Sequence, residues 1–235
     1  MIYKNRLGEC KMKRLVVLVT IALCLLGGSA LCENSLKVVT DNFIEFDGDT
    51  GYYLAKVENT GTAPIATDSS SLVLFDEDNA LLATSEYVHS TPSYLVLQPG
   101  EYAYVYDFVW DDALEDGNVG SWMFSAGSDD SGYTRELVDC EARFELNGGY
   151  DNYIYVTFTN STDTVQYDYS VAVALYDTDG KLVFVDGASW DSFGIAPQST
   201  VTYKIYIDAD YINYYTSNSI EIDTVDALVY LYADD

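Results

Sequence analysis

Two acidic turns contain the carboxylates whose spacing is most suggestive of metal chemistry. Asp76 and Asp78 stand two residues apart in the first turn, and Asp177 and Asp179 repeat this spacing in the second. Carboxylate oxygens gathered in this way are ligands that Ca²⁺ prefers. Neither turn continues into a twelve-residue calcium loop with a distal Glu, and an Asp that starts a turn accepts backbone hydrogen bonds without any metal. We therefore expect an ordinary turn role for these aspartates and no cofactor, and calcium binding is the alternative.

The sequence indicates no catalytic residues. His89 is the single histidine, and it stands next to Ser90, Thr91 and Pro92, where a solvated loop residue is expected. No Gly-x-Ser-x-Gly pattern marks a nucleophile, and the several His and Cys of a zinc site are missing. Paired acids for glycoside hydrolysis are compatible with the composition, but in so acidic a chain such pairs arise by chance. We predict a protein that is not an enzyme, and an enzyme of unknown type is the further alternative.

Aromatic side chains are the second group with a candidate binding role. Tyr153 and Tyr155, two of the 22 tyrosines, occupy alternate positions of an expected strand, so their rings project from one face. Trp110 and Trp190 each precede an aspartate near an expected strand end, where exposure is expected. Such rings stack on sugars while nearby hydroxyls and carboxylates bind the sugar hydroxyls. The alternative is that tyrosine, a good strand former, simply half-buries its ring.

The charge of the chain excludes several partners. Five of the 11 basic residues lie before residue 15 and one of the 38 acidic residues lies before Glu33, which leaves six bases, 37 acids and a net charge of −31 for the remainder. Such a charge repels nucleic acid and anionic membrane surfaces. Because 49% of the residues are hydrophobic, the chain has the side chains for a core and is not a disordered acidic tail.

Residues 1–32 have the pattern of a secretory signal peptide. Basic residues at 13–14 precede an apolar run at 15–26, which is too short to span a bilayer comfortably, and small residues follow it. Translation is expected to start at Met12, with residues 1–11 untranslated, because Gly8-Glu9 can be encoded by a purine-rich ribosome-binding sequence. We therefore expect a bacterial protein that is secreted or held at the cell surface, with no membrane span in the mature chain.

Two cysteines bear on the mature chain. Cleavage is expected near Cys32, and whether Cys32 is retained or lipidated stays open. The residues before it reverse the order of a bacterial lipobox, which argues against lipidation. Cys140 can form an internal disulfide only if Cys32 survives cleavage. We expect Cys140 instead to be a small buried apolar residue on a strand.

The acidic turns join alternating apolar runs, which is the pattern of a β-hairpin. Alternate residues of 171–176 fall on opposite faces, so we expect one face to be buried and the other to be wet. Gly180, and Asn79 in the earlier hairpin, are suited to the positive φ that closes such a turn with a bulge. No long segment has a convincing helical period.

The chain matches itself at a spacing of about one hundred residues. The strand pattern at residues 53–59 recurs at 154–160 with an offset of 101, and each copy ends in an asparagine, Asn59 or Asn160. An offset that drifts while the pattern persists indicates a duplicated domain. Short strands rich in Tyr, Val, Ile and Thr predict an all-β fold of two antiparallel sandwiches. We expect them over residues 33–127 and 133–235, joined by a polar linker at 127–132.

The second hairpin resembles the FxLYD-type immunoglobulin-like domain of bacterial secreted and surface proteins. Residues 175–177 match the motif as Leu-Tyr-Asp, and Val173 stands where the family has Phe. In the first copy, Phe75 replaces the motif's Tyr and Leu72 replaces its Phe. The resemblance covers most of both copies, and it implies tandem immunoglobulin-like β-sandwiches with an extracytoplasmic role and no catalytic residues.

These observations predict a non-catalytic binding or structural module whose partner is an unknown protein or glycan. The alternative is a carbohydrate-binding module that uses exposed Tyr and Trp. The candidate ligand residues are Trp110, Trp190, Tyr153 and Tyr155.

Overall fold

The computed structural model describes residues 36–46, 48–116, 118–129, 131–190 and 193–232. The expected signal peptide, the Met12 start and Cys32 lie outside these residues. Ser35–Asp235 forms one compact unit. Within the described ranges, no helix combines the length and apolar character needed to cross a membrane.

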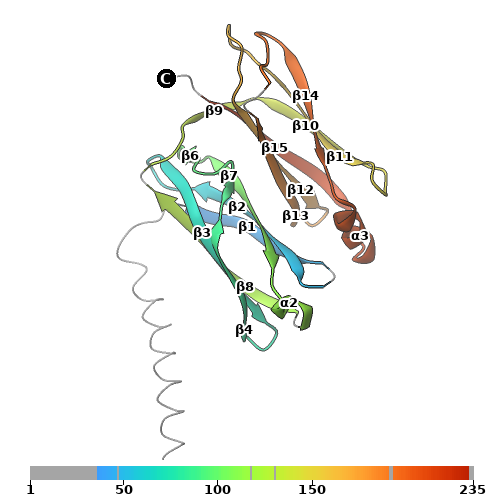
Figure 1. Cartoon of the computed structure of the whole chain (residues 1–235). Helices are drawn as coiled ribbons and strands as arrows, with labels where there is room; N and C mark the ends of the chain where they lie inside the picture. Colours follow the sequence, from blue (N-terminus) through green and yellow to red (C-terminus); the bar gives the residue numbers. More distant parts are fainter. Residues whose placement is uncertain (1–35, 47, 117, 130, 191–192, 233–235) are drawn as a thin grey trace, which may run out of the picture. The chain divides into compact units, whose positions relative to one another are not determined.

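The strands of residues 36–129, here called the first half, form two antiparallel sheets (Figure 1). One sheet has the order β1-β2-β7-β5, and the other has the order β4-β3-β6 with β8 also paired to β3. The bounds are Leu36–Glu45 (β1), Thr50–Asn59 (β2), Ile65–Asp76 (β3), Leu81–Val88 (β4), Ser90–Thr91 (β5), Val96–Leu97 (β6), Tyr102–Trp110 (β7) and Val119–Asp129 (β8). A short helix, α2, spans Ala113–Asp116.

The strands of residues 135–232, the second half, form two further antiparallel sheets, β10-β11-β14 and β13-β12-β15-β9. The bounds are Arg135–Val138 (β9), Cys140–Leu146 (β10), Asn152–Thr159 (β11), Tyr169–Asp177 (β12), Leu182–Trp190 (β13), Thr200–Tyr206 (β14), Ala209–Ser217 (α3) and Ile222–Tyr232 (β15). The predicted all-β, antiparallel sandwich fold is confirmed. That the two halves are tandem copies of one domain stays a prediction.

Both acidic turns close as the sequence predicts. Asn79 and Gly180 have φ of 61° and 77°, and the strand pairing shifts register beside each turn. The first carboxylate of each turn holds the returning strand: Asp76 Oδ1 accepts from the amide of Ala80 at 2.7 Å. Asp177 Oδ1 accepts from the amide of Lys181 at 2.8 Å. The turn role predicted for these two aspartates is therefore observed.

A buried asparagine stands at the end of β2, and a second one directly follows β11. Asn59 Nδ2 donates to the carbonyls of Ala63 and Leu97, at 2.9 Å each. Asn160 Nδ2 donates in the same pattern to the carbonyls of Thr164 and Ile195, at 2.8 Å each. Both asparagines have no exposed surface. Each side chain therefore satisfies buried backbone groups and fixes the loop that follows its strand.

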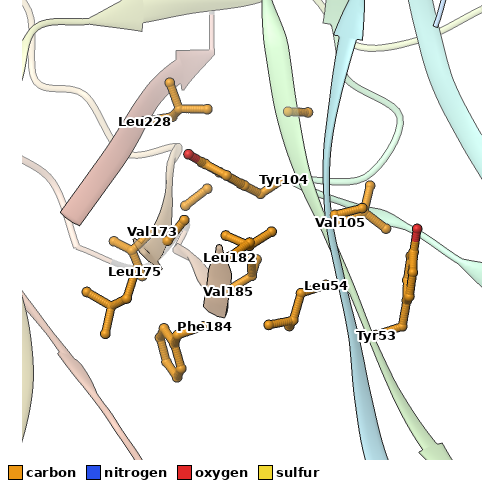
Figure 2. Packing of buried hydrophobic residues seen from close by; sticks show 14 of the residues in the cluster. Tyr53, Leu54, Tyr104, Val105, Val173, Leu175, Leu182, Phe184, Val185 and Leu228 are labelled. Carbon is orange, nitrogen blue, oxygen red and sulfur yellow. The ribbon is translucent and has the colours of Figure 1, made fainter. Parts of the chain in front are cut away.

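The sheet that contains β2 packs against the sheet that contains β12. Figure 2 shows Leu54 and Tyr104 on the side of their sheet that faces Leu182 and Leu228, whereas Tyr53 projects from the opposite side. All five side chains are buried. Both inner sheets are therefore covered on both faces, and we call the contact between them the seam.

The prediction that one face of residues 171–176 is wet is wrong. Ala172 and Ala174 are fully buried, and Tyr176 is half-buried. Small side chains let the two sheets approach closely: a Cβ added at Gly187 of β13 would lie 2.0 Å from Thr91 Oγ1 in the first half. A strand that is buried on both faces has a nearly continuous apolar sequence, and residues 171–175 have such a sequence.

A polar cluster crosses the seam. Asp226 Oδ2 accepts hydrogen bonds from the hydroxyls of Tyr102 at 2.7 Å and Tyr104 at 2.5 Å. The Tyr104 hydroxyl also lies 3.0 Å from that of Tyr176, and Lys56 Nζ lies 3.6 Å from Asp226 Oδ2. Burial is the main cause that raises the pKa of Tyr104, so its hydroxyl stays protonated. We call these five residues the seam cluster.

Two elements differ from the sequence prediction. Helix α3 begins after Asp208, whose side chain accepts from the amide of Asp210 at 3.0 Å, and it buries Tyr211 and Tyr215 at a spacing of four residues. The prediction of a linker at 127–132 is wrong for the first three of these residues, because β8 continues to Asp129. Gly127 is needed there, since a Cβ would lie 2.0 Å from the carbonyl of Ser69.

Candidate functional site

The outward face of the β10-β11-β14 sheet brings together the tyrosines predicted as ligand residues. Burial alternates along β11, so Tyr153 and Tyr155 are partly exposed while their neighbours face the core. Across the pair with β14, Tyr153 lies opposite Tyr206 and Tyr155 lies opposite Lys204. We call six outward residues the tyrosine face: Arg143, Glu145, Tyr153, Tyr155, Lys204 and Tyr206.

Basic side chains cover the rings of the tyrosine face. Lys204 Nζ lies 3.3 Å from the ring centroid of Tyr153, and Arg143 Cζ lies 4.0 Å from that of Tyr155. The rings of Tyr153 and Tyr206 have centroids 5.7 Å apart. An exposed cation–π contact contributes about 0.5–1 kcal/mol, so a ligand that stacks on these rings has to displace a cation at that cost.

Threonine hydroxyls continue the same face. Thr157 and Thr202 lie opposite each other with their hydroxyl oxygens 2.8 Å apart, and Thr159 and Thr200 repeat the arrangement at 2.8 Å. The face therefore offers aromatic rings at one end and paired hydroxyls at the other. This combination is able to contact a sugar by stacking and by hydrogen bonds.

The structure does not bring the tryptophans to the tyrosine face. Trp110 ends β7, in a sheet of the first half, and 71% of its surface is exposed, as predicted. Its indole Nε1 donates to Asp49 Oδ2. Trp190 ends β13 opposite Tyr169, and its side chain lies outside the described part of the chain.

The acidic turns hold their carboxylates apart from other metal ligands. Asp78 and Asp179 are exposed, and Asp76 and Asp177 are engaged with backbone amides. In the part of the chain that the structure describes, no group of three or more His, Cys, Asp or Glu side chains is arranged to hold a metal ion. Calcium binding at these four residues stays an alternative prediction.

Cys140 lies on β10 with its thiol free and half-buried. Its sulfur donates to the carbonyl of Ala227 at 3.4 Å, and burial is the main cause that raises the pKa of the thiol. A raised pKa lowers the thiolate fraction and hence the reactivity. The side chain therefore behaves as the small apolar strand residue that was predicted.

A pocket of about 320 Å³ opens where the two halves meet. Its lining comes from three segments: residues 87 and 89–93, residues 106–108 of β7 and residues 187–189 of β13. Tyr87 and Phe108 stand at it with 76% and 50% of their surfaces exposed. We call it the junction pocket, and the sequence did not predict it because its three segments are far apart in the chain.

Two buried polar atoms of the junction pocket have no hydrogen-bond partner: His89 Nδ1 and Asp107 Oδ2. His89 is half-buried, and its ring centroid lies 5.5 Å from that of Tyr94, so the prediction of a solvated loop histidine is wrong. Burial is the main cause that raises the pKa of Asp107, while a hydrogen bond with Ser85 and the nearby His89 act in the opposite direction.

The hydroxyl beside His89 is already committed to its own loop. Ser90 Oγ donates to the carbonyl of Pro92 at 2.7 Å and lies 2.7 Å from Thr67 Oγ1. Ser90 is buried at 6% exposure. In this arrangement His89 does not activate Ser90, so the pocket offers polar contacts to a ligand and no nucleophile at this serine.

Comparison with known proteins identifies no family. No family model matches the chain, and no curated protein sequence matches it. Among solved structures, red sea bream transglutaminase is similar over 74% of this chain and 27% of its own, with 9% identity and a TM-score of 0.27. A putative β-galactosidase from Bacteroides fragilis is similar over 72% of this chain and 28% of its own, with 14% identity and a TM-score of 0.21. The chain spans just over a quarter of each of these proteins, and TM-scores this low carry no argument about function.

Proposed function

We propose that the chain is a non-catalytic binding or structural module of a bacterium, secreted or held at the cell surface. One observation carries the proposal: the inner sheets are covered on both faces, whereas the tyrosine face and its threonines are turned outward on a regular sheet. An outward sheet face with rings, hydroxyls and both signs of charge is suited to binding a partner.

The domain organisation we propose is two tandem immunoglobulin-like sandwiches of the FxLYD type. The matched roles of Asn59 and Asn160 support it, as do the two acidic turns that close with the same hydrogen bonds. Tyr176, the tyrosine of the motif, lies in the seam next to Tyr104. Phe75 stands at the matching place of the first half, so the copies use this position differently.

The second candidate function is carbohydrate binding at the tyrosine face. Its support is specific: Tyr153, Tyr155 and Tyr206 lie together and are continued by paired threonine hydroxyls. Trp110 lies on another sheet, so a glycan bound at the tyrosine face does not need it.

Affinity electrophoresis of the full chain in neutral and acidic soluble polysaccharides tests this candidate. Loss of one stacking ring worth about 1.4 kcal/mol weakens binding about tenfold, so we expect Tyr155→Ala to release a bound polysaccharide. The matched control is Trp110→Ala, which removes an exposed ring on another sheet and should leave binding unchanged. Equal retardation of both variants contradicts a glycan site on this face. Turnover of any glycan contradicts the non-catalytic proposal.

Peptide mapping of the mature protein tests its proposed destination. A chain that begins at Glu33 and is recovered outside the cytoplasm is the expected result. Recovery of residues 2–11 in the precursor contradicts the start at Met12.

A further inference from the structure

We propose that the junction pocket binds a primary alkylammonium group, the chemistry of a lysine side chain or a linear diamine. The pocket is separate from the tyrosine face, and the inference stands whether or not that face binds a glycan.

The first argument is that two buried atoms, His89 Nδ1 and Asp107 Oδ2, have no hydrogen-bond partner among the described residues. Asp107 Oδ2 is an acceptor when the carboxyl is ionised, and His89 Nδ1 is an acceptor in one neutral tautomer of the ring. An ammonium group has three N–H donors and no acceptor, so it suits a site whose unpaired groups are both acceptors. Leaving such buried atoms unpaired is unfavourable, and a donor that a ligand supplies relieves this cost.

The second argument is charge. Asp107 lines the pocket, and Asp186, which is also half-buried, immediately precedes Gly187 at its wall. The lining contains neither Lys nor Arg, and the ion pairs of the described residues involve Asp226 and Glu145 instead. A bound cation neutralises buried charge, which a neutral sugar does not, and the strongly acidic chain raises the local concentration of cations.

The third argument separates an organic cation from a metal ion. Metal binding calls for several ligating side chains, and none of the described residues form such a group. Aromatic residues Tyr87, Tyr106 and Phe108 line the pocket. Rings of this kind attract an ammonium group and pack against an alkyl stem. The volume of about 320 Å³ is near the lower end for ligand pockets, so it suits a side-chain-sized ligand and not a polymer.

Isothermal titration calorimetry of the full chain tests the proposal. The free amine is 1,5-diaminopentane, and the protein-like ligand is Nα-acetyl-lysine methylamide, which keeps its ε-ammonium group. Saturable binding of either amine is expected, together with no binding of 1,5-pentanediol, which has the same length and no charge. Tighter binding of the lysine derivative assigns the site to a protein partner, and tighter binding of the diamine assigns it to a free polyamine. Binding of the diol or of a monosaccharide as tight as that of the amines overturns the proposal. The absence of saturation up to about 10 mM, where the binding free energy is only about 2.7 kcal/mol, also overturns it.

Asp107→Asn is the decisive variant, because it keeps the shape of the side chain and removes its charge. We expect it to weaken amine binding at least about tenfold. Asp78→Asn is the matched control: it removes one charge from an exposed turn and should leave the affinity unchanged. Equal affinities of the two variants overturn the assignment. In the unaltered protein, titration with the diamine should shift the ¹⁵N resonance of His89 Nδ1, and an unmoved resonance at saturation also overturns it.

Discussion

Each half of this chain is stabilised by a buried asparagine that makes the same kind of hydrogen bonds, Asn59 in the first half and Asn160 in the second. The amide of Asn160 donates to the carbonyls of Thr164 and Ile195, and its Oδ1 accepts from the amide of Thr162 at 3.0 Å. Asn160→Ala removes these side-chain hydrogen bonds and leaves buried groups unpaired, so we expect the free energy of unfolding to fall by about 2–3 kcal/mol. Urea denaturation measures this loss. Asn213→Ala, at an exposed position of α3, is the control and should change it by no more than about 0.5 kcal/mol.

The Tyr104 hydroxyl makes two of the contacts of the seam cluster. Tyr104→Phe removes the bonds to Asp226 and Tyr176 while the buried ring stays in place. A hydrogen bond to a charged group contributes about 1.5–3 kcal/mol, so we expect a loss of stability in that range. Tyr87→Phe, which removes an exposed hydroxyl, is the matched control for the denaturation experiment. If the two variants unfold at the same denaturant concentration, the cluster does not stabilise the seam.

At the scale of elements, the hairpin turns were the most predictable part of the structure. Gly180 has a φ of 77°, and a Cβ added there meets no atom within 4 Å, so only the backbone conformation opposes a side chain. We expect Gly180→Ala to lower the free energy of unfolding by about 1 kcal/mol. Gly180→Asn should retain most of the stability, because Asn79 adopts the same conformation in the first half. Thermal unfolding measures the stability of both variants. An equal loss of stability in Gly180→Ala and Gly180→Asn contradicts the prediction.

Local patterns account for what the sequence predicted and for what it missed. Three features depend only on near neighbours in the chain and could be predicted from the sequence. They are the turn aspartates, the positive φ at Asn79 and Gly180, and the alternation of Tyr153 and Tyr155. Helix α3 was missed because nine residues are too few for a clear period, although the cap at Asp208 was a visible signal. His89 and Asp107 could not be related, because only the folded sheets bring their segments together.

Across the whole molecule, the contact of the two halves was the least predictable feature. The apolar run at 171–175 is compatible with a strand that is buried on both faces, but nothing local identifies the sheet that covers the second face. Gly187→Ala tests that contact, because the added Cβ would lie 2.0 Å from Thr91 Oγ1. We expect a loss of about 1–3 kcal/mol, as for an overpacked core. Thr91→Ala in the same chain should recover part of the loss, and strict additivity of the two changes in urea denaturation contradicts a direct contact.

The buried tyrosines also give the whole molecule a pH limit. Burial is the main cause that raises the pKa of Tyr104, Tyr215 and Tyr230 above the usual value of 10.0. Above pH 10.0 the unfolded chain therefore binds fewer protons than the folded chain, so stability is complete below this pH and falls as the pH rises beyond it. Urea unfolding at a series of alkaline pH values should show the midpoint falling while tyrosinate absorbance rises with unfolding. A midpoint that stays constant through this range contradicts the prediction.

The position of β15 has a consequence for synthesis. This last strand lies inside its sheet, between β12 and β9, and it supplies Asp226 and Tyr230, whose hydroxyl donates to the carbonyl of Tyr102 at 3.3 Å. The first half leaves the ribosome well before these residues are made. At that stage the β1-β2-β7-β5 sheet has not yet been covered by the sheet that contains β15. A premature stop codon ahead of β15 therefore damages not only the half it shortens but also the half that was already complete.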